Sequence, residues 1–303
     1  MNMKQLNIRF EENKTISVII PTYNRIGKLI KVLPSYLSQK NVREIIIVDD
    51  GSTDNTEITI LKLLNNGTRI KYIRNLKNLG APTSRNIGIL NSKGSYIFFG
   101  EDDLELSRNH LLILLNHLKI NKADIIAGRR IWMQAQESKI DALKRANRYK
   151  PQPIDYKLIT TNCQVKIASD MQIPLIDASM LVRATIFKTL IYDSNYKINA
   201  WREETDFQIS AGEKGFKLYY CPHTVSYHLA KIKDKGGQHS SSIFKYELNV
   251  FWNNYYMTRK HWKYITTHFE VTSLFLYLIR FSSYRLIDKY FIPFIVRFKK
   301  LSE

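Results

Sequence analysis

The chain has 303 residues, of which 44% are hydrophobic and 12% aromatic, so it is long and apolar enough to fold into a globular domain with a large core. Its net charge of +19 indicates a polyanionic neighbour, but charge alone does not choose between a nucleic acid, a nucleotide-bearing substrate and an anionic membrane surface. The two cysteines, Cys163 and Cys221, lack metal-ligand spacing, which predicts free thiols in a reducing compartment and argues against a disulfide framework.

The first fourteen residues lack the apolar centre of a secretory signal. No stretch reaches the roughly 18 uninterrupted apolar residues that a membrane-spanning helix needs. We therefore expect a cytoplasmic protein.

Residues 15–128 alternate between short β-forming apolar runs and stretches with helical periodicity. The runs are nearly continuous in apolar residues, as in strands that are covered on both faces. This alternation predicts an α/β protein built from βαβ units, with a mostly parallel sheet and right-handed crossovers. The predicted strands are Ile16–Ile20, Glu44–Val48, Ile70–Ile73, Tyr96–Phe99 and Asp124–Ala127, and the predicted helices are Gly27–Ser38, Asn55–Leu64, Ala81–Leu90 and Arg108–Leu118.

Polar and charged residues follow the first four predicted strands. Ligands of parallel sheets bind beyond the carboxyl ends of the strands, so these four loops are expected to form one binding rim. Arg85 stands at a helix start, where its guanidinium is suited to binding a diphosphate. The loops read PTYNR at residues 21–25, DDGSTDNT at 49–56, NLGAPTSRN at 78–86 and EDD at 101–103.

The three acids Glu101, Asp102 and Asp103 follow the apolar strand Tyr96–Phe99 directly. Clustered carboxylates at the end of a buried strand repel one another and lose water, so they need a cation or a hydrogen-bonded ligand. Their oxygen atoms suit Mn2+ or Mg2+, which usually keep open positions for substrate phosphates. The alternative is a solvated acidic turn that opens the next helix.

Together, the four motifs closely resemble those of the family 2 glycosyltransferases, inverting nucleotide-sugar enzymes with the GT-A fold, a Rossmann-like and mostly parallel sheet flanked by helices. The resemblance covers residues 15–128 and implies that Asp103 binds the metal and that Asp102 approaches the ribose or the metal shell. Glu101 replaces the usual first Asp of the acidic motif. The remaining implied donor-site residues are Thr22, Tyr23 and Asp50, which would line the nucleobase pocket, and Arg85 near the third strand.

Residues 129–150 are basic and rich in helix formers, which predicts a solvated helical insertion over the sheet with Trp132 in the core. The alternative is that Trp132 faces the substrate. Residues 177–183 look like a strand that returns to the binding rim and is followed by a helix, and two short strands are expected at Lys217–Cys221 and Thr224–His228.

Residues 201–207 resemble the family's Glu-Asp-x-Asp segment, which implies that Glu204 is the catalytic base. Glu203 and Asp206 have an equally good explanation as acids that complement the dipole of a helix N-terminus. The resemblance also makes His228 a candidate metal ligand, against the alternative of a structural histidine. The polar stretch Lys231–Ser242 suits either a mobile lid over the donor or an ordinary exposed loop.

Residues 259–303 contain nine Lys or Arg and three Asp or Glu among many aromatic and aliphatic residues. Such a helical tail favours reversible contact with an anionic membrane, which would place the protein at the inner face of the cell membrane. The alternative is a helical pair that packs on the catalytic domain or forms a dimer. The expected parts are an N-terminal extension at 1–14, a nucleotide-sugar half at 15–128, an acceptor and base half at 129–242, and the tail at 243–303.

We therefore interpret the chain as a metal-dependent inverting glycosyltransferase that moves a sugar from a nucleotide diphosphate sugar to a glycan or lipid-linked acceptor in surface polysaccharide synthesis. The main alternative is a catalytically inactive relative that serves as a partner or nucleotide-binding protein. A nucleic-acid-binding protein would leave the four strand-end motifs unexplained, so nucleic acid is not an expected partner. A sugar nucleotidyltransferase would need a glycine-rich basic loop where the chain has Pro21–Arg25.

Overall fold

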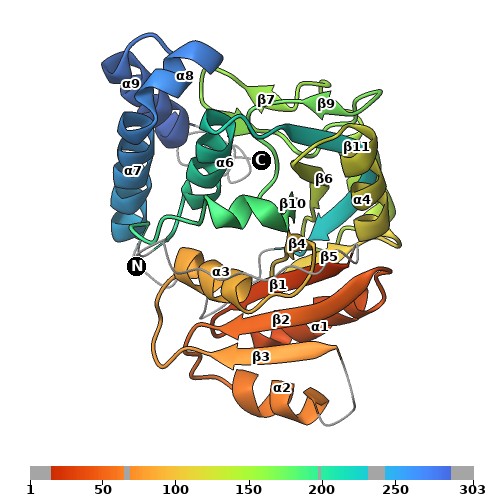
Figure 1. The fold of residues 1–303 in the computed structure, drawn as a ribbon. Coiled ribbons are helices and arrows are strands. Elements are labelled where there is room, and N and C mark those ends of the chain that lie inside the picture. The colour runs from red at the N-terminus through yellow and green to blue at the C-terminus, as the bar shows by residue number, and fades with distance from the viewer. Residues whose placement is uncertain (1–14, 65–68, 197–198, 231–242, 288–303) are drawn as a thin grey trace, which may run out of the picture.

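A nine-stranded sheet forms the centre of the computed structural model, which describes residues 15–64, 69–196, 199–230 and 243–287 (Figure 1). Its strand order is β3-β2-β1-β4-β10-β6-β11-β5, with β9 paired to β11, and β5, β9 and β10 run against the other strands. The sheet is therefore mostly parallel. The strands are β1 (Ile16–Thr22), β2 (Val42–Asp49), β3 (Ile70–Arg74), β4 (Tyr96–Phe99), β5 (Leu104–Leu106), β6 (Ile125–Trp132), β9 (Met171–Gln172), β10 (Met180–Arg183) and β11 (Leu218–His228), and β7 (Ile154–Asp155) pairs separately with β8 (Thr160–Thr161).

Helices cover both faces of the sheet, so the architecture has three layers. One hydrophobic core lies under α1, α2 and α4, and a larger one lies under α3, α6 and the C-terminal helices. The helices are α1 (Ile26–Leu37), α2 (Thr56–Leu64), α3 (Ala81–Leu90), α4 (His110–Ile120), α5 (Lys139–Ala146), α6 (Glu203–Glu213), α7 (Ile243–Lys260), α8 (Trp262–His268) and α9 (Leu274–Leu286), with a 3-10 helix at Ala184–Lys188.

Strand β1 shows why the apolar runs become central strands. Its side chains alternate between the two faces, so Val18 and Ile20 enter one core while Ile19 enters the other. All three are fully buried. A strand buried on both faces has no solvent-facing side to which polar residues could be assigned, which explains the continuous apolar sequence.

The predicted elements of residues 15–128 are confirmed, with small differences at their ends. Helix α3 begins and ends at the predicted residues, and β4 does as well. The fifth strand is the exception, because β6 continues to Trp132 instead of ending at Ala127.

The prediction for residues 129–150 was wrong in two respects. Arg129 and Arg130 belong to β6 and are buried, and helix α5 covers only Lys139–Ala146. Trp132 is 42% exposed, so its ring does not lie in the core. Counting basic residues could not reveal this, because Arg130 is buried beside Glu101 and Asp177, which are far away in the sequence, and Arg129 donates to the Gln164 carbonyl oxygen.

The two short strands predicted near residues 217–228 form the single strand β11, which contains a bulge. Cys221 pairs with Gly128 and Val225 pairs with Arg129, so the three residues between them have no partner in the ladder to β6. The acids at 101–103 lead into β5, an edge strand of the sheet, and not directly into the next helix.

The tail helices α7, α8 and α9 pack beside α6 (Figure 1). Val250, Met257 and Phe281 are buried there, and Arg202, just before α6, donates to Asn254 Oδ1 at 3.0 Å. This packing fits the alternative prediction for the described part of the tail. Among the helices described, none is long and apolar enough to cross a membrane. The predicted extension at 1–14, the lid at 231–242 and residues 288–303 lie outside the described residues.

Candidate active site

The acid turn, Glu101–Asp103, lies between β4 and β5 and is held by Tyr36 of α1. The Tyr36 hydroxyl donates to the Glu101 carbonyl oxygen and accepts from the Glu101 amide, both at 3.0 Å. Gly100 makes this approach feasible, because a Cβ atom there would lie 2.8 Å from the Tyr36 ring. The aromatic ring therefore fixes the backbone from which the three carboxylates extend.

Basic residues of the chain itself contact all three acids. Arg25 donates to Asp102 Oδ1 at 2.7 Å and also bonds Asp103 Oδ2, and Lys28 Nζ lies 3.7 Å from the same Asp103 oxygen. Arg130 donates to the two oxygens of Glu101 at 2.5 and 3.2 Å. The sequence indicated that clustered carboxylates need a cationic partner. It did not reveal that basic residues of the chain itself supply part of the compensating positive charge.

Glu101, Asp103 and His228 form a group that can hold a metal ion. One ligand atom from each lies within 4.8 Å of the others, and His228 Nε2 is 3.4 Å from Asp103 Oδ1. Arg25 and Lys28 contact the other oxygen, Oδ2, so Oδ1 faces the histidine. Burial lowers the pKa of His228, although Asp103 opposes the shift, which favours the neutral imidazole that ligates metals. This donor set fits Mn2+ or Mg2+.

The pKa values of Asp102 and Glu101 are shifted in opposite directions. Burial raises the pKa of Asp102 to about 7, against the opposing charge of Arg25 and with repulsion from Asp103. Burial acts in the same direction on Glu101, but Arg130 and then His228 outweigh it and lower its pKa to about 2. Glu101 is therefore a fixed negative charge beside Asp103, and Asp102 is the acid of the turn that can carry a proton near neutral pH.

Trp132 covers the outer side of this group. Its ring lies 4.1 Å from the His228 ring, centroid to centroid, and 5.3 Å from the Arg130 guanidinium. An exposed indole beside a candidate metal ligand can stack on a bound ring or sugar. The sequence-based alternative that Trp132 faces the substrate agrees with this position.

Arg85 connects α3 to the start of α6. Its guanidinium is buried, bonds Glu203 through one terminal nitrogen and donates to Glu204 Oε1 at 3.2 Å through the other. The Glu203 side chain is fully buried, and burial raises its pKa to about 8 against the charge of Arg85. The Glu204 side chain is 24% exposed. Of the two glutamates, Glu204 is therefore the one that an acceptor can reach.

Asp177 forms an ion pair with Arg130, which also bonds Glu101 of the acid turn, and sequence reasoning gave Asp177 no role. Its carboxylate lies 2.9 Å from Arg130 Nε, and burial raises its pKa to about 6, with contributions from both Glu101 and Glu204. The acid turn and Glu204 thus share one electrostatic environment. The missed signal was the Asp that opens the predicted strand returning to the rim.

Thr22, Tyr23 and Asp50 lie at the ends of β1 and β2. The Thr22 hydroxyl donates to Asp102 Oδ2 at 2.8 Å, and Tyr23 is half-buried. Asp50 accepts 2.8 Å hydrogen bonds from the backbone amides of Leu79 and Gly80, among others. These bonds fix the loop that leads into α3 and hence position Arg85. The predicted nucleobase residues therefore surround the rim, and Asp50 also organises it.

Asp206 differs from the two glutamates before it on α6. It accepts from the Tyr196 hydroxyl and lies 2.9 Å from Lys260 Nζ and from His261 Nε2. Its side chain is 3% exposed. Asp206 therefore joins α6 to the tail helices, which is a structural role.

A mostly parallel α/β sheet with carboxylates, an imidazole and a buried arginine at the carboxyl ends of its strands defines a GT-A type glycosyltransferase scaffold. The family model for glycosyl transferase family 2 matches residues 17–173, about half of the chain, and the chain belongs to this family.

Curated relatives match only part of the chain. The poly(ribitol-phosphate) beta-N-acetylglucosaminyltransferase TarP of Staphylococcus aureus is 38% identical over 121 residues, which cover 38% of this chain and 36% of TarP. The glycosyltransferase GlyG of Streptococcus pneumoniae is 31% identical over 118 residues, which cover 38% of this chain and 39% of GlyG. The matched region thus spans little more than a third of either relative.

Solved structures match over most of the chain at low identity. Staphylococcus aureus TarS in complex with UDP-GlcNAc superposes with a TM-score of 0.61 and 14% identity, covering 90% of this chain and 73% of the TarS chain. GalNAc-T7 with UDP, GalNAc and Mn2+ superposes with a TM-score of 0.61 and 16% identity, covering 92% of this chain and 58% of that chain. At such identities the likeness concerns the fold, including the part after residue 128 where the sequence motifs end.

Proposed function

We propose that the protein transfers a glycosyl group from a nucleotide diphosphate sugar to an acceptor hydroxyl, with inversion at the anomeric carbon, in the synthesis of a surface polysaccharide or related glycan. Two observations carry this proposal: Glu101, Asp103 and His228 form one group that can hold a metal ion, and a buried arginine orients an accessible glutamate, Glu204. The named activities of TarP and GlyG support the reaction class.

Glu204 is assigned as the catalytic base. It accepts the proton of the acceptor hydroxyl while the hydroxyl oxygen attacks the anomeric carbon and the bond from that carbon to the diphosphate breaks. Arg85 acts as a positioning residue, because its 3.2 Å hydrogen bond holds the Glu204 carboxylate in one orientation. The diphosphate contact predicted for Arg85 remains a proposal, since both terminal nitrogens of Arg85 bond carboxylates here.

Asp103 and His228 would hold the divalent cation, Mn2+ or Mg2+, with Glu101 as a further negative charge beside them. When bound, such a cation supplies positive charge that stabilises a departing diphosphate. Asp102, placed by Thr22 and Arg25, faces the donor side of the turn and is assigned to the ribose. Thr22, Tyr23 and Asp50 are assigned to the nucleobase pocket.

The direct test is a screen of nucleotide sugars with the purified chain, measuring release of nucleoside diphosphate and transfer of sugar. UDP-N-acetylglucosamine is the first donor to test, because the TarS structure contains it and TarP is named as an N-acetylglucosaminyltransferase. We expect turnover with added Mn2+ or Mg2+ and much less after treatment with a chelator. Calorimetric binding of UDP without any turnover would instead favour the inactive-partner alternative.

We further propose that the tail, residues 259–303, contacts an anionic membrane near a lipid-linked acceptor. On α9, Phe275, Leu276 and Ile279 form an exposed apolar stripe. The tail carries six more basic than acidic residues. If half of this excess faces lipid, at about 1 kcal/mol each, the attraction favours binding by roughly 100-fold.

Sedimentation with vesicles tests the membrane proposal. Phe275→Glu should reduce co-sedimentation with vesicles that contain phosphatidylserine, and neutral vesicles should bind weakly throughout. Ile58→Glu, on the exposed face of α2, is the matched control and should bind as the wild type does. Equal binding of Phe275→Glu and wild type would remove the support for this contact.

A further inference from the structure

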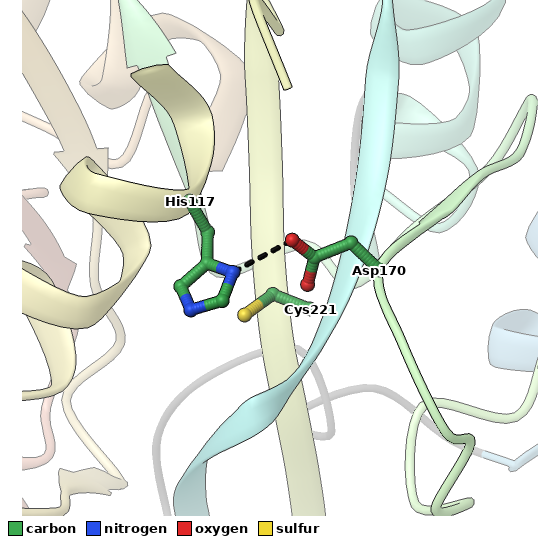
Figure 2. A group of neighbouring side chains, drawn as sticks. All are labelled: His117, Asp170 and Cys221. Atoms are coloured by element: carbon green, nitrogen blue, oxygen red, sulfur yellow. Dashed lines mark hydrogen bonds and ion pairs between the residues drawn. The ribbon is translucent and has the colours of Figure 1, made fainter. Parts of the chain in front are cut away.

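A second group of metal-ligating side chains lies away from the acid turn. The His117 cluster consists of His117 near the end of α4, Asp170 just before β9 and Cys221 on β11 (Figure 2). One ligand atom from each residue lies within 4.8 Å of the others. Three segments that are distant in sequence therefore direct a nitrogen, an oxygen and a sulfur atom toward one point.

Asp170 lies at the centre of the cluster. Its Oδ2 is 2.6 Å from His117 Nδ1, and the side-chain amide of Asn121 donates to the same oxygen at 2.6 Å. Its Oδ1 is buried and is matched with no hydrogen-bond donor among the described residues. The side chain is only 10% exposed. A buried carboxylate oxygen without a donor is costly unless a cation completes its surroundings.

The bulge in β11 brings a fourth candidate ligand to the same place. Pro222 has no backbone N–H to donate to the ladder between β11 and β6. The residues between Cys221 and Val225 do not pair with β6. His223 lies within the bulge with Nε2 3.7 Å from Asp170 Oδ1, and its ring stacks on the His117 ring at 4.6 Å between centroids. The His223 side chain is 43% exposed, so an ion can enter from its side.

The types of donor atom indicate which ion fits. Thiolate and imidazole ligands favour zinc over magnesium or calcium, and two histidines, a cysteine and a carboxylate make a four-ligand set. In a tetrahedral zinc site the ligand atoms lie about 3.3–3.8 Å apart, as bond lengths of about 2.0–2.3 Å require. From the observed limit of 4.8 Å, the ligand atoms would have to come closer by about 1 Å at most.

Cys221 is buried, and its Sγ lies within 4.8 Å of the ligand atoms of His117 and Asp170. Zinc binding would release the thiol proton and place positive charge beside the Asp170 carboxylate, whose Oδ1 has no hydrogen-bond donor matched to it among the described residues.

We propose that His117, Asp170 and Cys221 bind a structural Zn2+ ion, with His223 as the fourth ligand. Asn121 orients Asp170 from outside the ligand set. The ion joins the end of α4 and the segment before β9 to the β11 bulge. Strand β11 then continues to His228, roughly 20 Å further along an extended strand. The bound ion therefore fixes the strand that carries the candidate active-site histidine.

The experiment measures zinc in the full chain, purified without a polyhistidine tag under reducing conditions. Elemental analysis should give close to one zinc per chain after dialysis. The apoprotein reconstituted with Co2+ should show the thiolate-to-cobalt charge-transfer absorption and the visible bands of a tetrahedral site. Cys221→Ser should lose the charge-transfer absorption, and His117→Gln should lose most of the zinc.

Two control variants separate this site from other causes. Cys163→Ser changes the other buried cysteine, and Asp103→Asn changes the acid turn, and both should retain zinc and the cobalt spectrum. If Cys221→Ser fails to fold by circular dichroism, His223→Gln provides the same test at an exposed side chain and should weaken zinc binding. Wild-type protein that takes up no zinc when it is supplied, or a cobalt spectrum without thiolate charge transfer, would overturn the proposal.

Discussion

The acid turn and the His117 cluster both lie against β11 but differ in their surroundings. At the acid turn, three basic side chains contact the carboxylates, and the ligand atoms are mostly oxygen. At the His117 cluster, the ligands are softer, and Asp170 Oδ1 lacks a donor among the described residues. Internal cations compensate part of the charge of the acid turn, so we expect that an ion bound there would exchange more readily. The His117 cluster instead gains stability from an ion that stays bound.

The largest expected effect comes from Asp103→Asn. A unit charge pair at 4 Å is worth about 4 kcal/mol at an effective dielectric near 20, so loss of the cation ligand should reduce transfer by about 1,000-fold. Steady-state transfer with Mn2+ present measures the loss. Asp141→Asn, an exposed carboxylate on α5, is the control and should keep full activity. Transfer by Asp103→Asn at the wild-type rate would contradict the assigned role of the acid turn.

Arg130→Met tests whether internal cations support the acid turn. Arg130 contacts both Glu101 and Asp177, so its removal takes the cationic partner away from the buried Asp177 and from the partly buried Glu101. Breaking buried ion pairs in this way typically costs about 3–5 kcal/mol. Urea unfolding should show this loss, and excess Mn2+ should restore part of it. Lys157→Met removes an exposed pair with Glu270 and should cost about 1 kcal/mol or less.

Glu204→Gln tests the base. General base catalysis typically contributes about 100- to 10,000-fold, so kcat should fall by at least about 100-fold with little change in KM for the donor. Glu203→Gln should cost less, because the Glu203 side chain is fully buried and its pKa is raised to about 8. If the two variants ranked in the opposite order, the base would be Glu203.

The sequence predicted the first half of the fold because local patterns determine it. Strand β1 is nearly continuous in apolar residues, and α3 follows a glycine and has a proline in its first turn, so both could be identified from neighbouring residues. The contacts of Arg130 and Asp177 could not be identified, because they join residues 47 positions apart across the sheet. The Cys221–His223 spacing was visible, but His117 and Asp170 are far away in sequence, and only the fold brings them together.

The smallest expected effect concerns a third acidic cluster, around His261 at the junction of α6 with the tail. His261 contacts Asp206 and Glu213, and Lys260 and the Tyr196 hydroxyl also face Asp206. Burial opposes protonation of His261, but the hydrogen bond to Asp206 and the two carboxylate charges outweigh it and raise the pKa of His261. Here the protonated histidine supplies the positive charge that compensates the carboxylates. Arginines supply it at the acid turn, and we propose that a metal ion supplies it at the His117 cluster.

A raised folded-state pKa means that the stabilisation is fully present below the ordinary histidine pKa of about 6.5 and is lost as pH rises through the folded value. The melting temperature should therefore fall by roughly 2–4 °C as the pH rises from 6 through the folded-state pKa of His261. His261→Gln should flatten this dependence, and His268→Gln, an exposed histidine on α8, should leave it unchanged. Thermal melts across the pH range measure both. A wild-type slope retained in His261→Gln would show that a charge on this histidine does not contribute to holding the tail against α6.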